Sequence, residues 1–116
     1  MSDEIETLLE SSLSFDDKTI TVVRSLILFL LAFFRDGVQY RELKNSLKIS
    51  DGKLASNLKY LCELEYIKKE EVEIDNKKLD VYFITPRGKK EIEKISNWME
   101  NLIKIIKDGG LNHDEF

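Results

Sequence analysis

The sequence has one cysteine, one histidine and one proline among its 116 residues. Because Cys62 is alone, it can form neither an intramolecular disulfide nor a thiolate metal cage, and its place beside Leu61 in a helical pattern predicts a small buried apolar residue. A zinc site or a nucleophile and base pair needs more partners than His113 alone provides. We therefore expect no catalytic residue, no metal site and no cofactor, and we predict that the protein is not an enzyme.

Long apolar runs and an export signal are also missing. Residues 1–10 carry acidic side chains where a secretory signal has positive charge. The apolar run from Leu26 to Phe34 has nine residues, bracketed by Arg24 and Arg35, whereas a membrane span needs roughly 20. We predict a cytoplasmic protein without membrane contact, in which this run is a buried helix.

An excess of positive charge is missing as well, since the formal net charge is −4. Taken over the whole chain, this value argues against binding to nucleic acid. The charge is unevenly distributed, however. Residues 36–90 carry 12 basic and 10 acidic side chains, whereas residues 1–35 and 91–116 each carry 3 basic and 6 acidic ones. The middle of the chain is its only basic part.

The spacing of apolar residues predicts a mainly α-helical chain with one small β-hairpin. Helices are expected over 3–13, 18–35, 40–47, 50–65 and 86–107, and the hairpin over 67–84. We divide the chain into an N-terminal amphipathic helix and linker (1–17), one domain (18–90), a C-terminal dimerisation helix (91–108) and a tail (109–116).

The helix at 50–65 follows a tight turn over Lys48-Ile49-Ser50, and either Ser50 or Asp51 can cap its N-terminus. One side of this helix carries Leu54, Leu58, Leu61 and Glu65. Three of these four residues are leucine, so we predict that this side faces the core.

Alternating β-branched and aromatic residues predict the hairpin, with the polar stretch Asp75-Asn76-Lys77-Lys78 as its connection. Thr85-Pro86 then reads as an N-cap followed by proline at the first helical position, which opens the last helix.

Two helices have more apolar surface than one small domain can cover. The helix at 18–35 is apolar on nearly every side, and the last helix carries apolar residues at spacings of three and four, typical of a coiled-coil seam. The aromatic residues of these helices are compatible with an effector pocket, although core or dimer packing is the commoner use. We predict a homodimer whose interface contains Leu9, Leu26, Phe29, Phe33, Ile95, Trp98, Met99, Leu102 and Ile106.

The segment from Leu47 to Ile67 resembles the recognition segment of MarR/ArsR-type winged helix-turn-helix transcriptional regulators, most closely the small single-domain archaeal and bacterial ones. The residues on the family pattern are Asp51-Gly52, Leu54, Ser56, Leu58, Leu61, Tyr66-Ile67 and Ile84-Thr85-x-x-Gly88. The sequence departs from the pattern at Asn57, where the family often has His or Arg, and at Glu65, where it usually has Gly. Some relatives sense metals through cysteines in the preceding helix, but Tyr40 to Leu47 contains none.

The resemblance implies a transcriptional regulator that binds double-stranded DNA, at an inverted repeat, as a homodimer. Two helices joined by a short turn hold the second outward, so that it can enter a major groove about 12 Å wide, while the hairpin, or wing, touches the backbone. Lys53 is suited to a phosphate or a guanine edge, and Ser56 and Asn57 to base edges. The expected DNA contacts are Ser50, Gly52, Lys53, Ser56, Asn57, Lys59, Tyr60, Lys77 and Lys78.

Two plainer interpretations of the same residues stay open. The outward helix face is also compatible with simple solvation, and Lys77 and Lys78 with a turn that blunts a sheet edge and aids solubility. The acidic total charge also permits a winged helix that binds a partner protein and no DNA.

Overall fold

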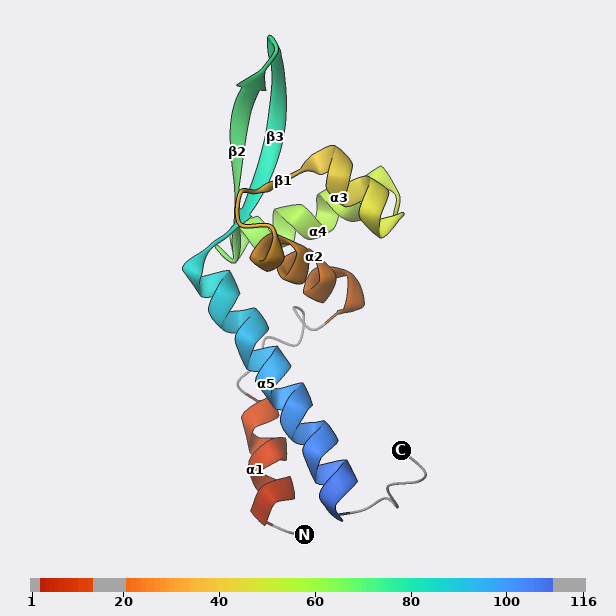
Figure 1. The fold of residues 1–116 in the computed structure, drawn as a ribbon, viewed down its shortest axis with the longest axis vertical. Coiled ribbons are helices and arrows are strands. Elements are labelled where there is room, and N and C mark those ends of the chain that lie inside the picture. The colour runs from red at the N-terminus through yellow and green to blue at the C-terminus, as the bar shows by residue number, and fades with distance from the viewer. Residues whose placement is uncertain (1–2, 14–20, 110–116) are drawn as a thin grey trace.

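The computed structural model describes residues 3–13 and 21–109, which form five helices and one three-stranded sheet. In chain order the elements are α1 (Asp3–Ser12), α2 (Val22–Phe33), β1 (Val38–Gln39), α3 (Tyr40–Leu47), α4 (Asp51–Glu63), β2 (Ile67–Ile74), β3 (Lys77–Ile84) and α5 (Pro86–Gly109). The helices α2, α3 and α4 gather around the base of the sheet as a head, and α5 extends from it as an arm with α1 alongside (Figure 1). This arrangement confirms the predicted fold class.

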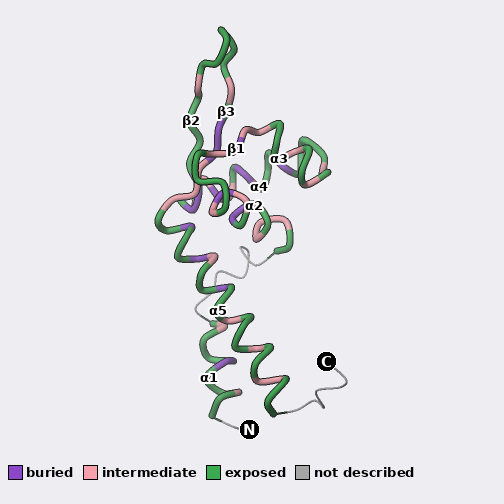
Figure 2. The backbone as a smooth tube through the Cα atoms, viewed as in Figure 1, coloured by how far each residue is buried: buried purple, intermediate pink, exposed green. Residues whose placement is uncertain are grey.

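The core of the head is made by apolar side chains from α2, α3, α4 and the base of the sheet (Figure 2). On α4, Leu54, Leu58 and Leu61 are at most 2% exposed, which confirms that the leucine side faces inward. Complete burial of one such side chain stabilises the fold by about 1.5–3 kcal/mol. The leucines therefore fix which side of α4 is left for solvent or for a partner.

The fourth helix ends two residues earlier than predicted, at Glu63. Glu65 adopts a left-handed backbone conformation, with φ 62°, and its N–H donates to the Cys62 carbonyl at 2.9 Å. The N–H of Tyr66 donates to the Leu61 carbonyl at 3.0 Å. These two bonds form a Schellman motif, in which Glu65 occupies the position that usually holds glycine. The prediction that Glu65 lies on the buried side is wrong, because this residue is exposed and lies outside the helix.

The hairpin is part of a three-stranded antiparallel sheet with the order β1-β3-β2. Val38 and Gln39 form the third strand, opposite Tyr82 and Val81. This short strand anchors the base of β3 beside α3. The outer part of the hairpin projects beyond the head and forms the wing (Figure 1).

The wing turn is tighter than predicted, because β3 begins at Lys77 and only two residues connect the strands. Asp75 and Asn76 have φ values of 53° and 66°. Positive φ at both central residues is the signature of a type I′ turn, whose twist matches that of the flanking strands. Lys77 and Lys78 thus lie in the first part of β3, opposite Ile74 and Glu73.

The last helix opens as predicted, with Pro86 in its first position and the Thr85 hydroxyl accepting from the Gly88 N–H at 3.1 Å. It runs to Gly109 without a break, so the boundary expected after residue 90 falls inside one helix. The indole N–H of Trp98 donates to the Leu8 carbonyl at 2.9 Å, which ties α1 to the arm.

The second helix begins at Val22, and its N-cap Thr21 accepts from the Arg24 N–H at 3.1 Å. The predicted helix start at residue 18, the linker over 14–17 and most of the tail, with His113, lie outside the described residues. Within residues 3–13 and 21–109, no helix combines the length and apolar character that a bilayer span requires.

Candidate nucleic-acid interface

Helices α3 and α4 form a helix-turn-helix pair joined by residues 48–50. Lys48 takes a left-handed conformation, φ 54°, which ends α3. The Ser50 hydroxyl then accepts from the Lys53 N–H at 3.2 Å, so Ser50 is the N-cap of α4. This capping satisfies a backbone donor that the helix itself cannot pair.

A second contact fixes the start of α4 against α3. The carboxylate of Asp51 accepts from the Lys44 ammonium at 2.8 Å and from the Tyr40 hydroxyl at 3.1 Å. The hydrogen bond from Lys44, and then that from Tyr40, lowers the pKa of the Asp51 carboxyl below its ordinary 3.8. The hydrogen bond between Lys44 and Asp51 also raises the pKa of the Lys44 ammonium. The folded state loses the stabilisation from Asp51 as the pH falls through the lowered pKa of this carboxyl. It loses the stabilisation from Lys44 as the pH rises through the raised pKa of this ammonium. Both contributions are therefore complete at neutral pH.

The side of α4 away from the leucines is open to solvent over its whole length. Five of the residues expected to contact DNA are exposed here: Ser50, Gly52, Lys53, Ser56 and Lys59. A Cβ built on Gly52 would meet no atom within 4 Å, so nothing inside the protein requires glycine there. A partner could approach the first turn of α4 closely.

Two of the predicted DNA-contacting residues on α4, Asn57 and Tyr60, are only half-exposed. The Asn57 side chain accepts from Arg24 Nε at 2.8 Å and donates to the Lys53 carbonyl at 2.8 Å. The Arg24 guanidinium carbon lies 3.8 Å from the Tyr60 ring centroid. Arg24 was not predicted from the sequence, because nothing in the pattern links positions 33 residues apart.

The wing carries both signs of charge. Lys77 and Lys78 are exposed near its tip, but Lys78 Nζ lies 3.6 Å from a carboxylate oxygen of Glu71. Farther down β2, Lys68 pairs in the same way with Glu70 at 3.1 Å. The wing therefore has a weaker positive field than its lysines alone would give.

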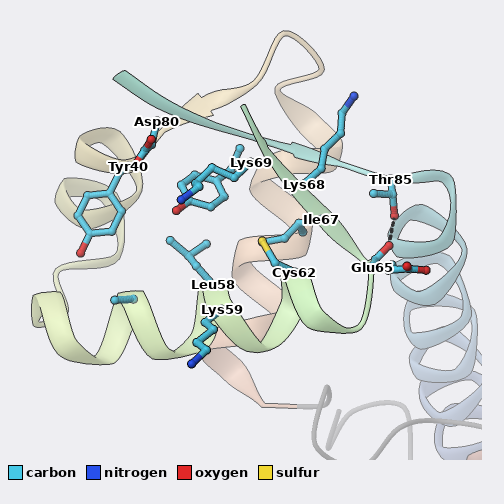
Figure 3. Close-up of a pocket in the computed structure, with 12 residues that line it drawn as sticks. Tyr40, Leu58, Lys59, Cys62, Glu65, Ile67, Lys68, Lys69, Asp80 and Thr85 are labelled. Atoms are coloured by element: carbon cyan, nitrogen blue, oxygen red, sulfur yellow. Dashed lines mark hydrogen bonds between the residues drawn. The ribbon is translucent and has the colours of Figure 1, made fainter. Parts of the chain in front are cut away.

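An open groove of about 790 Å³ separates α4 from the base of the wing (Figure 3). Leu58, Ile67 and Tyr82 give it an apolar lining. Its charged lining residues are of both signs: Lys59, Lys68, Lys69, Glu65 and Asp80. Tyr82 is 7% exposed, and burial raises its pKa to about 12, so the hydroxyl keeps its proton at neutral pH.

Cys62 also lines this groove and is half-buried. Burial raises the pKa of its thiol. A thiol that holds its proton is a poor nucleophile and a poor metal ligand. Within residues 3–13 and 21–109, no group of three or more His, Cys, Asp or Glu side chains could hold a metal ion.

The residues predicted for a dimer interface divide into exposed and internally packed ones. Leu26, Phe29 and Phe33 on α2 are 44%, 52% and 68% exposed. Leu9 and Met99 are about half exposed, at 51% and 50%. The others are less available: Ile95 is buried within its own chain, and Trp98, Leu102 and Ile106 are half-buried.

Comparison with known proteins links this arrangement to DNA binding. A family model described as a winged helix DNA-binding domain matches residues 23–103. Among solved structures, the MepR–DNA complex of S. aureus matches with a TM-score of 0.67 at 17% identity, over 85% of this chain and 78% of that chain. The transcriptional regulator Tm0710 from Thermotoga maritima matches with a TM-score of 0.66 at 26% identity, over 85% and 69%.

A third structure, of ZitR from Lactococcus lactis, is described as a zinc-responsive MarR family member. It matches with a TM-score of 0.61 at 22% identity, over 87% of this chain and 66% of that chain. No curated protein sequence matches this chain.

Proposed function

Because the chain belongs to the family of winged helix DNA-binding domains, we propose that it is a sequence-specific transcriptional regulator that binds duplex DNA as a homodimer. The resemblance to MarR-type regulators, predicted from residues 47–67, is confirmed by the family model and the solved structures. These comparisons support a DNA-binding regulator as the general function. The contacting residues, the dimer and the inverted-repeat target are our proposals.

The observation that carries the proposal is the outward side of α4. Lys53, Ser56 and Lys59 lie on this side, while the leucines hold the opposite side in the core. An α-helix fits into the DNA major groove, where short polar side chains reach base edges and lysines reach guanine or phosphate oxygens. Ser56, near the middle of the exposed face, is the residue best suited to read a base.

The groove between α4 and the wing gives a path for one DNA strand. If α4 enters the major groove, the adjacent sugar–phosphate backbone passes between α4 and the wing. Three lysines and two carboxylates line this path, so its charge is positive by one. The acidic α1 lies at the far end of the arm, away from α4, so that its charge is well separated from the DNA (Figure 1). The net charge of −4 is thus compatible with a basic contact surface.

The homodimer proposal is supported by an apolar stripe on α2 formed by Val22, Leu26, Phe29 and Phe33. All four side chains are between 44% and 77% exposed. The stripe lies opposite the buried face of α2, so the chain's own core does not cover it. A second copy would bury these side chains. Binding to an inverted repeat then requires the two α4 helices to lie about one DNA turn apart, roughly 34 Å.

The substitution Phe29→Glu tests whether this apolar stripe forms the dimer interface. Since Phe29 is exposed in the single chain, the substitution should leave the fold intact, but it would bury an unpaired charge in the dimer. We expect wild type at twice the chain mass of 13.6 kDa in sedimentation, and the variant at the single mass. Asn45→Glu places the same charge on the exposed face of α3 and should stay dimeric. A wild-type mass of 13.6 kDa at micromolar concentration would contradict the homodimer.

One substitution on α4 and one on the wing test which residue contacts a base and which contacts a phosphate. After selection of bound duplexes from a random pool, Ser56→Ala should lower affinity for the selected sequence by about tenfold, with little loss on a scrambled duplex. Lys77→Ala should weaken binding to both duplexes alike, since phosphates carry no sequence information. Equal effects of the two substitutions on both duplexes would refute this assignment.

A protein-binding winged helix is the second candidate. The carboxylates of Glu70 and Glu71, which pair with wing lysines, favour it, because they weaken the attraction of the wing for phosphates. If the chain bound a partner protein and no DNA, it would show no duplex binding even at low salt.

A further inference from the structure

Arg24 connects α2 to the recognition helix α4 through two different contacts. Its Nε donates to Asn57 Oδ1 at 2.8 Å, and its guanidinium carbon lies 3.8 Å from the Tyr60 ring centroid. Only a planar guanidinium can donate along its edge while stacking on an aromatic ring with its face. A lysine at this position would keep the charge and lose this geometry.

These contacts determine how Asn57 is held. Its amide oxygen accepts from Arg24, and its amide nitrogen donates to the Lys53 carbonyl on the preceding turn of α4. Both ends of the side chain are engaged within the protein. The amide keeps one further donor and acceptor for a base, but it would have to give up both hydrogen bonds to adopt any other orientation.

Tyr60 follows Asn57 by one helical turn, so the two side chains are neighbours on the same flank of α4. Arg24 therefore spans two consecutive turns along one edge of the outward face. Arg24, Asn57 and Tyr60 are all half-buried, which limits the other rotamers that they can adopt.

We propose that Arg24 is a positioning residue for DNA reading, which holds Asn57 and Tyr60 in one arrangement and thereby sets the shape that α4 presents to bases. This inference rests on the proposed DNA-binding function. A recognition face with fixed side chains accepts fewer sequences than one whose side chains can rearrange to suit each duplex. Loss of the Arg24 contacts should therefore weaken binding to the selected sequence and leave binding to other duplexes unchanged.

The test compares Arg24→Lys and Arg24→Ala with the wild-type protein on the selected duplex and on a scrambled one. For Arg24→Lys we expect the ratio of the two affinities to fall about tenfold, with scrambled-duplex affinity and salt dependence unchanged. Arg24→Ala should lower the ratio in the same way. If Arg24 were only a phosphate contact, Arg24→Lys would behave as wild type, and that result would overturn the inference.

Two further measurements distinguish a positioning role of Arg24 from a purely structural one. Each variant is assayed well below its melting temperature, and an unchanged affinity ratio with a lowered melting temperature would overturn the inference. Side-chain amide NMR should show Asn57 more mobile in Arg24→Lys than in wild type. Asn57→Ala should then lower the ratio in wild type but have little further effect in the Arg24→Lys background.

The outcomes for the two proposals are distinguishable. Wild-type protein that binds no duplex would overturn the proposed function and this inference with it. Specific binding by wild type, together with an unchanged affinity ratio in Arg24→Lys, would leave the function standing and overturn the role of Arg24 alone.

Discussion

Replacing Gly88 with alanine is expected to destabilise the protein by about 3 kcal/mol, because the added Cβ has no space. A Cβ at this position would overlap the carbonyl oxygen of Tyr66 and lie 3.0 Å from a side-chain carbon of Ile84. The first of these neighbours is backbone, which cannot rotate away as a side chain can. The junction between α5 and the head would have to shift as a whole.

Hydrogen bonds hold this junction in place. The Tyr66 carbonyl accepts from the Thr85 N–H at 3.1 Å, and the Thr85 hydroxyl donates to the Glu65 carbonyl at 2.6 Å (Figure 3). The same hydroxyl accepts from the Gly88 N–H. A shift that made room for the added methyl group would disturb the cap of α5 and the turn after α4 together.

Urea unfolding of Gly88→Ala measures the loss in free energy of unfolding. In a thermal scan, the melting temperature of this variant should fall by on the order of 10 °C. Gly52→Ala is the matched control. It makes the same chemical change in the first turn of α4, where the new Cβ meets no atom within 4 Å. Alanine is the better helix former, so Gly52→Ala should be neutral or more stable by up to about 1 kcal/mol. A loss below about 1 kcal/mol in Gly88→Ala would show that the junction yields easily.

Much of the fold was predictable from local patterns. The leucine spacing at residues 54, 58 and 61 determined the orientation of α4, because burial of that side dominates its energetics. Thr85-Pro86 marked the start of α5 through capping chemistry that involves only adjacent residues. The outward side of α4 followed from the same periodicity, so most of the candidate interface was visible in the sequence.

What the sequence did not reveal depends on contacts between distant segments. Two residues at 38–39 carry no periodicity, so their pairing with β3 could not be read from the pattern. The contact of Arg24 with Asn57 exists only because α2 packs beside α4. The early end of α4 came from the left-handed conformation of Glu65, which most non-glycine residues avoid at a cost of about 1–2 kcal/mol.

The apolar seam of α5 was interpreted as surface for a partner, yet part of it serves the single chain. Ile95 is buried, and Trp98 is bonded to Leu8 on α1. Spacing alone does not tell whether a seam packs against its own chain or a second copy. Exposure on α2 and at Met99 now indicates the surface for the proposed dimer.

The second large effect expected is the response of DNA binding to salt. Each copy of the chain presents Lys53 and Lys59 on α4 and Lys77 on the wing, all exposed. If each neutralises one phosphate, a dimer displaces about six counterions, and affinity should fall on the order of a thousandfold between about 50 and 200 mM salt. Lys53→Ala should flatten this dependence, since it removes one phosphate contact from each subunit.

Salt titration of duplex binding, carried out on the wild-type protein and on Lys53→Ala in parallel, tests most directly whether the outward side of α4 contacts DNA. We expect tight binding at about 50 mM salt and a steep, linear fall of log affinity with log salt concentration. No measurable duplex binding at about 50 mM salt, or an affinity that stays constant as salt rises, would contradict this contact.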